Sequence, residues 1–206
     1  MEKRIVKVGA DPFPPYQYIQ DDGTPAGSDY ECVKKLFAAM GYEIELTIKE
    51  WSEIQGMVDS KELDAAFQVQ ETPERAKKYK FSALFRNAET QVVTSDPELR
   101  IDSLSQIAAK NLTIGLIQGY VNGDEIDSLP AENKKLYSGT RTLLLGISKG
   151  EVDIGVFDKG VKEYLMADAG IENIYAIDNL TFVRPLSVIF HNTALRDEFN
   201  KALAAQ

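Results

Sequence analysis

Two charged side chains of opposite sign, Arg75 and Asp158, stand beside expected strand and helix ends. Arg75 follows Thr72-Pro73-Glu74, where Thr as N-cap and Pro after it predict the start of a helix. A cation is disfavoured there by the helix dipole, so Arg75 either pairs with a neighbouring glutamate or forms a guanidinium fork for a ligand carboxylate. Asp158 follows the strand expected at 153–157 and can cap the next helix, bind an ammonium group, or do both.

Aromatic side chains gather at or near expected strand ends and in the loops after them. Phe13 and Tyr16 lie in a loop stiffened by three prolines, where a preorganised aromatic wall lowers the entropic cost of gripping a ligand. For Tyr18, Trp51 and Phe67, ordinary packing is an equal alternative. The full set is Phe13, Tyr16, Tyr18, Trp51, Phe67 and Tyr120.

Catalytic and metal chemistry find little support in the sequence. His191 is the single histidine, and Cys32, the single cysteine, lies midway along an amphipathic segment where packing is the better interpretation. The sequence carries none of the usual nucleophile-elbow, phosphate-loop or dinucleotide motifs, and its carboxylates are scattered. We therefore expect no enzyme, no catalytic residue, no metal site and no cofactor.

Composition narrows the class of protein further. The chain has 206 residues, 44% of them hydrophobic and 27% charged, which suits one large globular domain or two small ones. Its 23 basic and 32 acidic side chains give a net charge of −9, so a nucleic acid is not an expected partner. No apolar run is long enough to cross a membrane. Residues 1–4 hold no signal segment, so the protein is either cytoplasmic or has had such a segment removed.

Strands and helices alternate along the chain, which predicts an α/β fold with parallel strands. One pattern occurs twice: residues 60–67 and 148–157 both follow a helix and run through an acidic turn into a strand that ends in Phe. A strand followed by Gly also recurs, at Gly9 and Gly115. We therefore expect two α/β lobes of similar plan, with ligands beyond the carboxyl ends of their strands and a cleft between the lobes. Strands are expected near residues 4–8, 44–48, 65–69, 112–116, 153–157 and 174–177. Helices are expected after the N-cap residues Thr72, Thr140 and Asn192, and from Ser28 and Lys159 onward.

The order of these segments resembles the bacterial extracellular solute-binding proteins of family 3, over nearly the whole chain. The most specific segment is TPER-x(5)-FS, from Thr72 to Ser82. Weaker matches add to it: Asp11-Pro12-Phe13-Pro14-Pro15-Tyr16, Gly27-x-Asp29, Trp51, Gln118-Gly119, Gly150-Glu151-Val152-Asp153, Asp158 and Asn200-Lys201-Ala202-Leu203.

This resemblance implies the periplasmic-binding-protein type 2 fold, with two lobes that are joined by two crossing strands and close on a ligand by hinge motion. The crossings are expected at 90–94 and 181–189. Lobe 1 then comprises 1–92 with 186–206 returning to it, and lobe 2 comprises 93–185.

The resemblance also implies roles for individual residues. Arg75 holds a ligand α-carboxylate, Asp158 the α-amino group, and Phe13 or Tyr16 stacks on the ligand. Other residues line the pocket, and they are Asp11, Trp51, Phe67, Gln68, Gln70 and the backbone of Gly119, Tyr120 and Val121 at a helix N-terminus.

Three features depart from the family pattern. The stretch from Asp64 to Arg75 is one residue shorter than usual and carries Phe67, Gln68 and Gln70 where small residues are common. Tyr120 replaces a small hydroxyl residue. The chain ends at Gln206, before the closing helix of many members, which suits a sensor domain or a trimmed receptor.

The expected function is non-catalytic binding of a small solute, a polar or uncharged aromatic amino acid. The expected setting is the periplasmic or extracellular face of a bacterial membrane, for a monomer that works with an ABC-transporter permease or with the membrane-spanning remainder of a sensor kinase. The alternative is an enzyme on the same scaffold, similar to cyclohexadienyl dehydratases. It needs a pocket acid with a raised pKa, for which Glu71 is the candidate.

Overall fold

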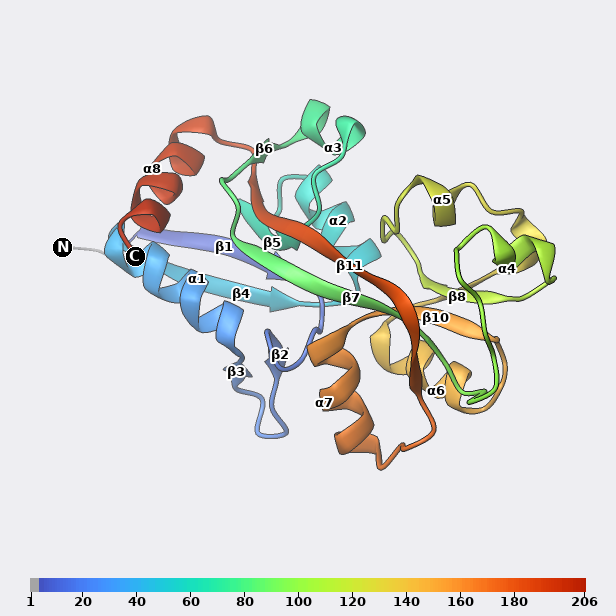
Figure 1. The fold of residues 1–206 in the computed structure, drawn as a ribbon. Coiled ribbons are helices and arrows are strands. Elements are labelled where there is room, and N and C mark those ends of the chain that lie inside the picture. Colours follow the sequence, from blue (N-terminus) through green and yellow to red (C-terminus); the bar gives the residue numbers. More distant parts are fainter. Residues whose placement is uncertain (1–3) are drawn as a thin grey trace. The chain divides into compact units, whose positions relative to one another are not determined.

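The computed structural model describes residues 4–206, in which the chain forms two compact units (Figure 1). Unit 1 consists of the residues up to Asn87 together with Arg184–Gln206, and unit 2 is the continuous segment Ala88–Val183. The chain passes between the units within two strands, β7 (Arg86–Thr94) and β11 (Tyr175–Phe190). The boundaries expected from the sequence fall inside the same two strands, and their role as limits of ligand-binding lobes stays a prediction. The expectation about a signal segment rests mainly on residues 1–3, which lie outside the described part.

The strands of unit 1 are ordered β4-β1-β5-β11. β1 pairs in parallel with both β4 and β5, whereas β11 runs antiparallel to β5. Besides the crossing strands, its elements are β1 (Arg4–Ala10), β2 (Tyr18–Ile19), β3 (Pro25–Ala26), α1 (Ser28–Ala39), β4 (Tyr42–Ile48), α2 (Trp51–Asp59), β5 (Ala65–Val69), α3 (Pro73–Lys78), β6 (Lys80–Phe81) and α8 (Thr193–Ala204).

The strands of unit 2 are ordered β9-β8-β10-β7. β8 pairs in parallel with β9 and β10, and β7 runs antiparallel to β10. Its further elements are α4 (Gln106–Ala109), β8 (Ile114–Ile117), α5 (Asp124–Asp127), the 3₁₀ helix η1 (Ala131–Asn133), β9 (Lys134–Tyr137), α6 (Thr140–Ser148), β10 (Ile154–Asp158) and α7 (Lys159–Ala169).

Both units therefore follow one plan. The first strand lies between the second and the third, and the third pairs with an antiparallel crossing strand. The α/β class with mostly parallel strands, expected from the alternation of elements, is confirmed. The plan also makes α3 and α7 equivalent, because each follows the third strand of its unit.

The repeated acidic turn has a physical cause. In unit 1, Asp64 Oδ2 accepts a hydrogen bond from the backbone N–H of Lys7, at 2.8 Å. In unit 2, Asp153 Oδ2 accepts one from the N–H of Thr113, at 2.6 Å. Each carboxylate thus ties the start of the third strand to the first strand. A buried or edge N–H needs an acceptor, which explains why an aspartate occurs at both places.

The repeated glycine has a cause as well. A Cβ added to Gly9 would lie 2.4 Å from a methyl carbon of Leu63, and one added to Gly115 would lie 2.3 Å from a methyl carbon of Leu143. In both units a leucine occupies the space that a side chain on the first strand would need. The glycines therefore permit close packing of a neighbouring segment on the sheet.

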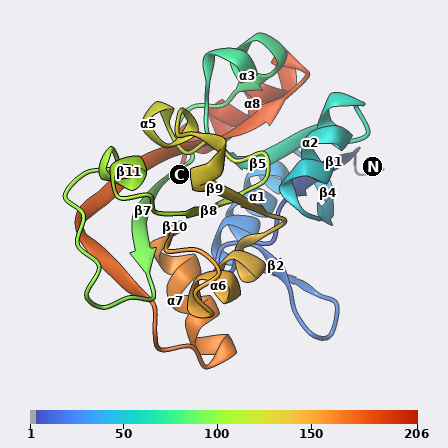
Figure 2. The same ribbon diagram turned by 90° about the vertical axis from the view of Figure 1, so that its right-hand side faces the viewer.

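Helices cover both faces of each set of strands. In unit 1, α1 and α8 lie side by side over the face that carries Val6 and Val8 (Figure 1). Phe199 of α8 lies 5.3 Å, between ring centroids, from both Phe37 of α1 and Phe190 of β11. In unit 2, α6 and α7 are neighbours, as the second view shows (Figure 2).

One expected N-cap residue is wrong by one position. Thr140 is the first residue of α6, and Gly139 is its N-cap. The hydroxyl of Thr142 accepts a hydrogen bond from the N–H of Gly139, at 3.3 Å, so a different threonine supports this end. At α3 and α8 the expected caps are present, since Thr72 and Asn192 each accept from the N–H three residues further on.

Candidate ligand-binding site

The loop after β1 holds its two aromatic rings in a tight turn. The N–H groups of Tyr16 and Gln17 both donate to the carbonyl of Phe13, at 2.9 and 3.2 Å, and Phe13 N–H donates to Gln17 O at 2.8 Å. The rings of Phe13 and Tyr16 are stacked, with centroids 6.0 Å apart and planes at 30°. Both side chains are half-buried. The loop therefore presents an ordered aromatic pair, as a preorganised ligand wall requires.

The start of α1 fixes the backbone of this loop. The carbonyl of Tyr16 accepts hydrogen bonds from the N–H groups of Asp29 and Tyr30, at 2.9 and 3.2 Å. Gly27, the N-cap, has φ 122°, and a Cβ there would lie 2.2 Å from the Tyr16 carbonyl oxygen. Only glycine allows this approach, so the Gly27-x-Asp29 motif serves to seat Tyr16.

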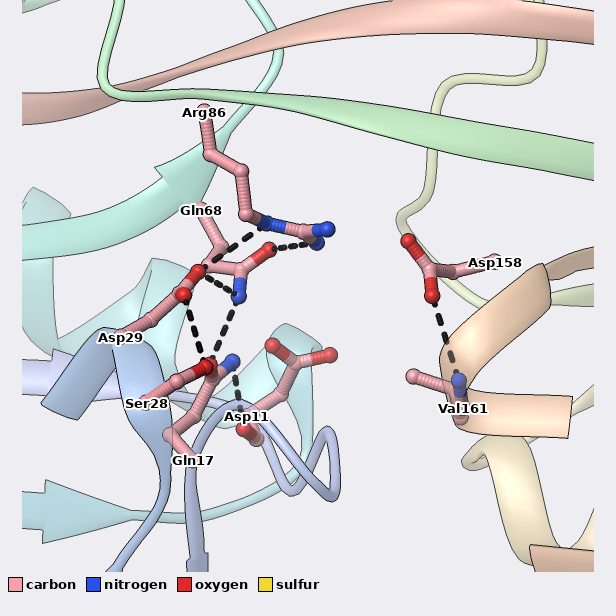
Figure 3. A network of polar contacts seen from close by, with 8 residues as sticks. All are labelled: Asp11, Gln17, Ser28, Asp29, Gln68, Arg86, Asp158 and Val161. Carbon is pink, nitrogen blue, oxygen red and sulfur yellow. Dashed lines mark hydrogen bonds and ion pairs between the residues drawn. The ribbon is translucent and has the colours of Figure 1, made fainter. Parts of the chain in front are cut away.

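Beneath the loop lies a polar network that joins four segments of unit 1 (Figure 3). The side-chain amide of Gln68 donates to Asp29 Oδ2 at 2.6 Å and to Gln17 Oε1 at 2.8 Å. Its carbonyl accepts from Arg86 Nη2 at 2.7 Å, and Arg86 Nε lies 3.0 Å from Asp29 Oδ2. Gln17 is fully buried and donates to the carbonyl of Asp11. The network thus fixes the loop, α1, β5 and the start of β7 to one another.

Sequence inspection missed Arg86 and Gln17 as members of the site. The Arg86 guanidinium carbon lies 3.8 Å from the centroid of the Tyr16 ring. Arg86 lies 18 positions from Gln68 and still further along the chain from Asp29 and Tyr16, and Gln17 lies 51 positions from Gln68. A local motif therefore carries no signal for them, apart from a polar Gln68 in a strand of otherwise apolar residues.

The stretch from Asp64 to Arg75, which departs from the family pattern, contains a β-bulge in β5. Ser187 of β11 pairs with Val69 and Ile189 pairs with Ala66, so β5 has one more residue than its partner over this interval. Gln68 has φ 64°, which is uncommon outside glycine. At the bulge the side chain of Gln68 reaches the polar network.

Phe67, expected in the pocket, belongs to the core of unit 1. It is fully buried within the cluster formed by α1, α8 and the central strands. We therefore leave Phe67 out of the proposed ligand contacts. A place near a strand end does not fix which face of the sheet a side chain takes, and the bulge beside Phe67 changes the alternation of β5.

Arg75 and Trp51 meet where α2 and α3 begin. Trp51 is the first residue of α2, and the Arg75 guanidinium carbon lies 5.3 Å from its ring centroid. Arg75 Nη1 donates to the carbonyl of Gln70 at 3.0 Å, while the Arg75 N–H donates to the Thr72 hydroxyl. The guanidinium is thus oriented by a backbone acceptor and an aromatic face. Arg75 is 9% exposed, Trp51 is 5% exposed, and Gln70 is half-buried.

Acidic groups stand near the start of α2, next to Trp51. Asp11 is buried after the end of β1, and Glu50 is the half-buried N-cap residue of α2. Burial raises the pKa of Glu50, and the negative charges of Asp11 and Glu53 raise it further. Two carboxylates close enough to repel one another form a local negative potential that favours a cation.

In unit 2, Asp158 caps α7. Its Oδ1 accepts a hydrogen bond from the N–H of Val161, at 3.1 Å, and the residue is 6% exposed (Figure 3). The capping role weighed from the sequence is therefore present. A carboxylate has capacity for further donors, so capping is compatible with binding an ammonium group.

The loop after β8 carries the other expected residues of unit 2. Gly119 has φ 81°, and the N–H of Tyr120 donates to the carbonyl of Ile117 at 3.1 Å. Tyr120 and Val121 are half-buried. The expectation that these residues form a helix N-terminus is wrong, because α5 begins at Asp124 with Gly123 as its N-cap.

The groups considered for catalysis lie outside these clusters. His191 Nε2 contacts the carbonyl oxygen of Val58, Cys32 donates to the Gln206 side chain, and Glu71 is exposed. Between residues 4 and 206, no three His, Cys, Asp or Glu side chains gather as metal ligands. Over the same described range, no helix has both the length and the apolar character needed to cross a membrane.

Two α/β units connected by two strands have the plan of the periplasmic-binding-protein fold, and polar and aromatic groups lie at or after the ends of β1, β5, β8 and β10. The crystal structure of a histidine kinase sensor domain with similarity to periplasmic binding proteins matches with a TM-score of 0.88 at 18% identity, over 98% of this chain and 90% of that one. The family model of the bacterial extracellular solute-binding proteins, family 3, matches residues 6–206, and the chain belongs to this family.

Two relatives in sequence carry names that state a ligand. The chain is 27% identical over 208 residues to the arginine-binding extracellular protein ArtP of Bacillus subtilis (strain 168), a match that covers 98% of this chain and 80% of ArtP. It is 30% identical over 110 residues to the L-cystine-binding protein TcyJ of Escherichia coli (strain K12), a match that covers 52% of this chain and 41% of TcyJ.

Proposed function

We propose that the protein is a non-catalytic receptor for a free amino acid. Arg75 from unit 1 holds the ligand α-carboxylate, and Asp158 from unit 2 holds the α-ammonium group. The observation that supports this best is the burial of these two opposite charges at equivalent places, the starts of α3 and α7. These charges complement the carboxylate and the ammonium group of a zwitterion. ArtP and TcyJ, named as amino-acid binders, agree with the proposal.

The ligand side chain is proposed to carry a positive charge. Asp11 and Glu50 form a negative region beside Trp51. Burial raises the pKa of Glu50 most, the charges of Asp11 and Glu53 raise it further, and a cationic ligand group would reduce that repulsion. This differs from the polar or uncharged aromatic ligand expected from the sequence. The remaining proposed ligand contacts are Phe13, Tyr16, Trp51, Gln70, Gly119, Tyr120 and Val121. Gln68 is proposed to hold the loop of Phe13 and Tyr16 through the polar network.

The proposed setting is the outer side of a bacterial membrane. There the receptor would deliver its ligand to an ABC-transporter permease, or report it through the membrane-spanning part of a sensor kinase. The family name supports an extracellular location, and the histidine kinase sensor domain shares the fold.

A thermal-shift scan tests the proposal. The protein is unfolded and refolded to remove any ligand carried through purification, then melted with each of the twenty L-amino acids and with small carboxylic acids. A ligand at 100 times its Kd adds about 2.7 kcal/mol of stability, which raises the melting temperature by several degrees. We expect the largest shift with arginine or lysine. A shift with acids that lack an amino group would overturn the role of Asp158, and no shift with any compound would overturn the amino-acid proposal.

The same samples also test whether the protein is an enzyme and not a receptor. A lyase on this scaffold needs a buried acid, and Glu71 is exposed, whereas Glu50 is the half-buried acid with a raised pKa. Proton NMR of each compound after incubation shows whether it is consumed. Unchanged spectra are expected. Consumption of a cyclic acid that stops in a Glu50→Gln variant would establish the enzyme instead.

A further inference from the structure

Arg86 occupies an unusual place for a charged side chain. It is the first residue of β7, only 16% of its side chain is exposed, and the paired side chain of Asp29 is 9% exposed. Its guanidinium group lies over the Tyr16 ring, at 3.8 Å from carbon to centroid. A planar guanidinium can stack on an aromatic face while its edges form hydrogen bonds, which an ammonium group cannot do.

The guanidinium of Arg86 forms one ion pair and one hydrogen bond with neighbouring side chains (Figure 3). Nε lies 3.0 Å from Asp29 Oδ2, and Nη2 donates to Gln68 Oε1 at 2.7 Å. Gln68 in turn donates to Asp29 and to Gln17. Arg86 is therefore fixed in orientation by two side chains, which are themselves held by the bulge in β5 and by the start of α1.

Tyr16 is held at two levels. Its carbonyl accepts from the N–H groups of Asp29 and Tyr30, which fixes its backbone. These bonds leave the side-chain torsions of Tyr16 free, since the ring lies beyond Cβ. The Arg86 guanidinium and the Phe13 ring are two flat surfaces that restrict the ring. Of these, only Arg86 is anchored by a charged partner.

We propose that Arg86 is a positioning residue: it fixes the Tyr16 ring so that this side chain forms a ready-made wall for the ligand. The inference rests on the proposed function, because the contact of Tyr16 with ligand is part of that proposal. Ordering a ring before binding removes that entropic cost from the binding step, so loss of Arg86 weakens binding through Tyr16 and not by direct contact.

The first experiment observes the ring without any ligand. The protein is labelled with 3-fluorotyrosine, and the ¹⁹F signal of Tyr16 among nine tyrosines is assigned with a Tyr16→Phe variant. Arg86→Gln should move this signal, and Arg86→Lys should move it too, because lysine cannot stack and bridge together. Arg4→Gln is the matched control: it removes an arginine that lies 4.2 Å from the Tyr42 ring in the same unit, and it should move the Tyr42 signal alone. An unmoved Tyr16 signal in both Arg86 variants overturns the proposal.

Arg86→Gln leaves Asp29 buried without its ion-pair partner, and this variant can fail to fold. The double variant Asp29→Asn/Arg86→Gln removes both charges and keeps hydrogen-bonding groups at both positions. Its Tyr16 signal should move in the same direction as in Arg86→Gln. An unmoved signal in a folded double variant counts against the proposal equally.

The second experiment measures affinity by calorimetry for the amino acid that gives the largest thermal shift. Asp29→Asn/Arg86→Gln should weaken binding about tenfold when Tyr16 is present, but less than about twofold in a Tyr16→Leu background. Equal weakening in both backgrounds means that Arg86 acts independently of Tyr16, and it overturns the inference. If the parent protein binds no amino acid, the proposed function fails, while the ¹⁹F signals still decide whether Arg86 holds the ring.

Discussion

Unit 1 and unit 2 share one strand plan, but they accommodate a buried cation in different ways. In unit 1, Arg86 pairs with the carboxylate of Asp29. In unit 2, Lys162 of α7 is 8% exposed, and its Nζ donates to the neutral amide of Gln91 at 2.7 Å. Burial lowers the pKa of Lys162, and the charge of Lys159 lowers it further, whereas Glu163 and Glu89 act in the opposite direction. One cation is thus compensated by a direct ion pair, and the other has a neutral acceptor.

The overall charge of the units does not explain this difference. Unit 2 carries 15 acidic and 8 basic side chains, a net charge of −7, while unit 1 carries 17 and 15, a net charge of −2. Lys162 therefore lies in the more acidic unit and still has an amide as its hydrogen-bond acceptor. Direct partners decide the state of a buried charge, because exposed charges beyond about 8–10 Å are largely screened at physiological salt.

The largest expected change in stability follows from removing the buried cation of unit 1, Arg86. Arg86→Met leaves Asp29 buried and uncompensated, which should lower the free energy of unfolding by about 3–5 kcal/mol. Urea denaturation measures this, with Arg4→Met as a control for an exposed stacked arginine. A loss below about 1 kcal/mol would show that the ion pair is not a buried one in solution.

Next comes a comparison of two N-cap glycines. Gly27 has φ 122° and a crowded Cβ position, whereas Gly123 at the start of α5 has φ 95° and open space where a Cβ would go. Gly27→Ala should cost about 3 kcal/mol, from backbone strain plus displacement of the Tyr16 carbonyl, and Gly123→Ala about 1 kcal/mol from strain alone. Thermal denaturation of both variants checks this. Equal losses would contradict the seating role of Gly27.

The third comparison concerns ligand affinity. Arg75→Ala should weaken amino-acid binding by at least ~2 kcal/mol, because breaking one side of a desolvated charged pair costs ~2–5 kcal/mol. Lys77→Ala, an exposed cation on the same short helix, should leave the Kd unchanged. Asp158→Asn tests the unit 2 partner, since asparagine keeps the helix cap and removes the charge. An Arg75→Ala protein that binds as tightly as the parent would remove Arg75 from the site.

Removing Lys162, the buried cation of unit 2, is expected to have a smaller effect on stability, of opposite sign to the effect of removing Arg86. Because burial lowers its folded-state pKa, the unfolded chain holds this proton more tightly, so the charged lysine reduces stability at neutral pH. The reduction fades as pH rises through the folded-state pKa toward 10.5. Lys162→Met should therefore raise the free energy of unfolding by about 1 kcal/mol at neutral pH, with a smaller gain in alkaline buffer. Lys159→Met, on the same helix with 44% of its side chain exposed, should change little. A loss of stability in Lys162→Met would refute this account.

The last comparison concerns two tyrosine–carboxylate pairs, one in each unit. Tyr79 in unit 1 is 2% exposed and donates to Asp59, and this bond is the main cause of the lowered pKa of Asp59. The stabilisation is present above pH 3.8 and is lost as pH falls below it. Tyr79→Phe should cost about 1 kcal/mol at neutral pH and flatten the acid side of the stability profile. In unit 2, Tyr137 contacts the exposed Glu151, and Tyr137→Phe should leave that profile unchanged.

The positions of residues within a local sequence pattern could be predicted, whereas contacts between distant segments of the chain could not. Thr72 and Pro73 mark the start of α3 and so place Arg75, while Asp64 and Asp153 revealed the repeated plan because each occupies the same turn. The partnership of Arg86 with Asp29 and Gln68 depends on three segments meeting in space. The burial of Phe67 in the core of unit 1 also lacked a local signal. A bulge with positive φ at a glutamine has no reliable sequence signal, and it changes which side chains leave the core.

The return of the chain to unit 1 has a consequence for synthesis on the ribosome. Unit 2 is one continuous segment, whereas unit 1 needs the last part of β11 and α8 to complete its core. Until Phe190 and Phe199 emerge, Phe37 of α1 has the ring of Tyr42 beside it but lacks these two others. The unit that begins first is thus finished last, and its apolar surface remains open to chaperones or to other nascent chains while unit 2 is already able to fold.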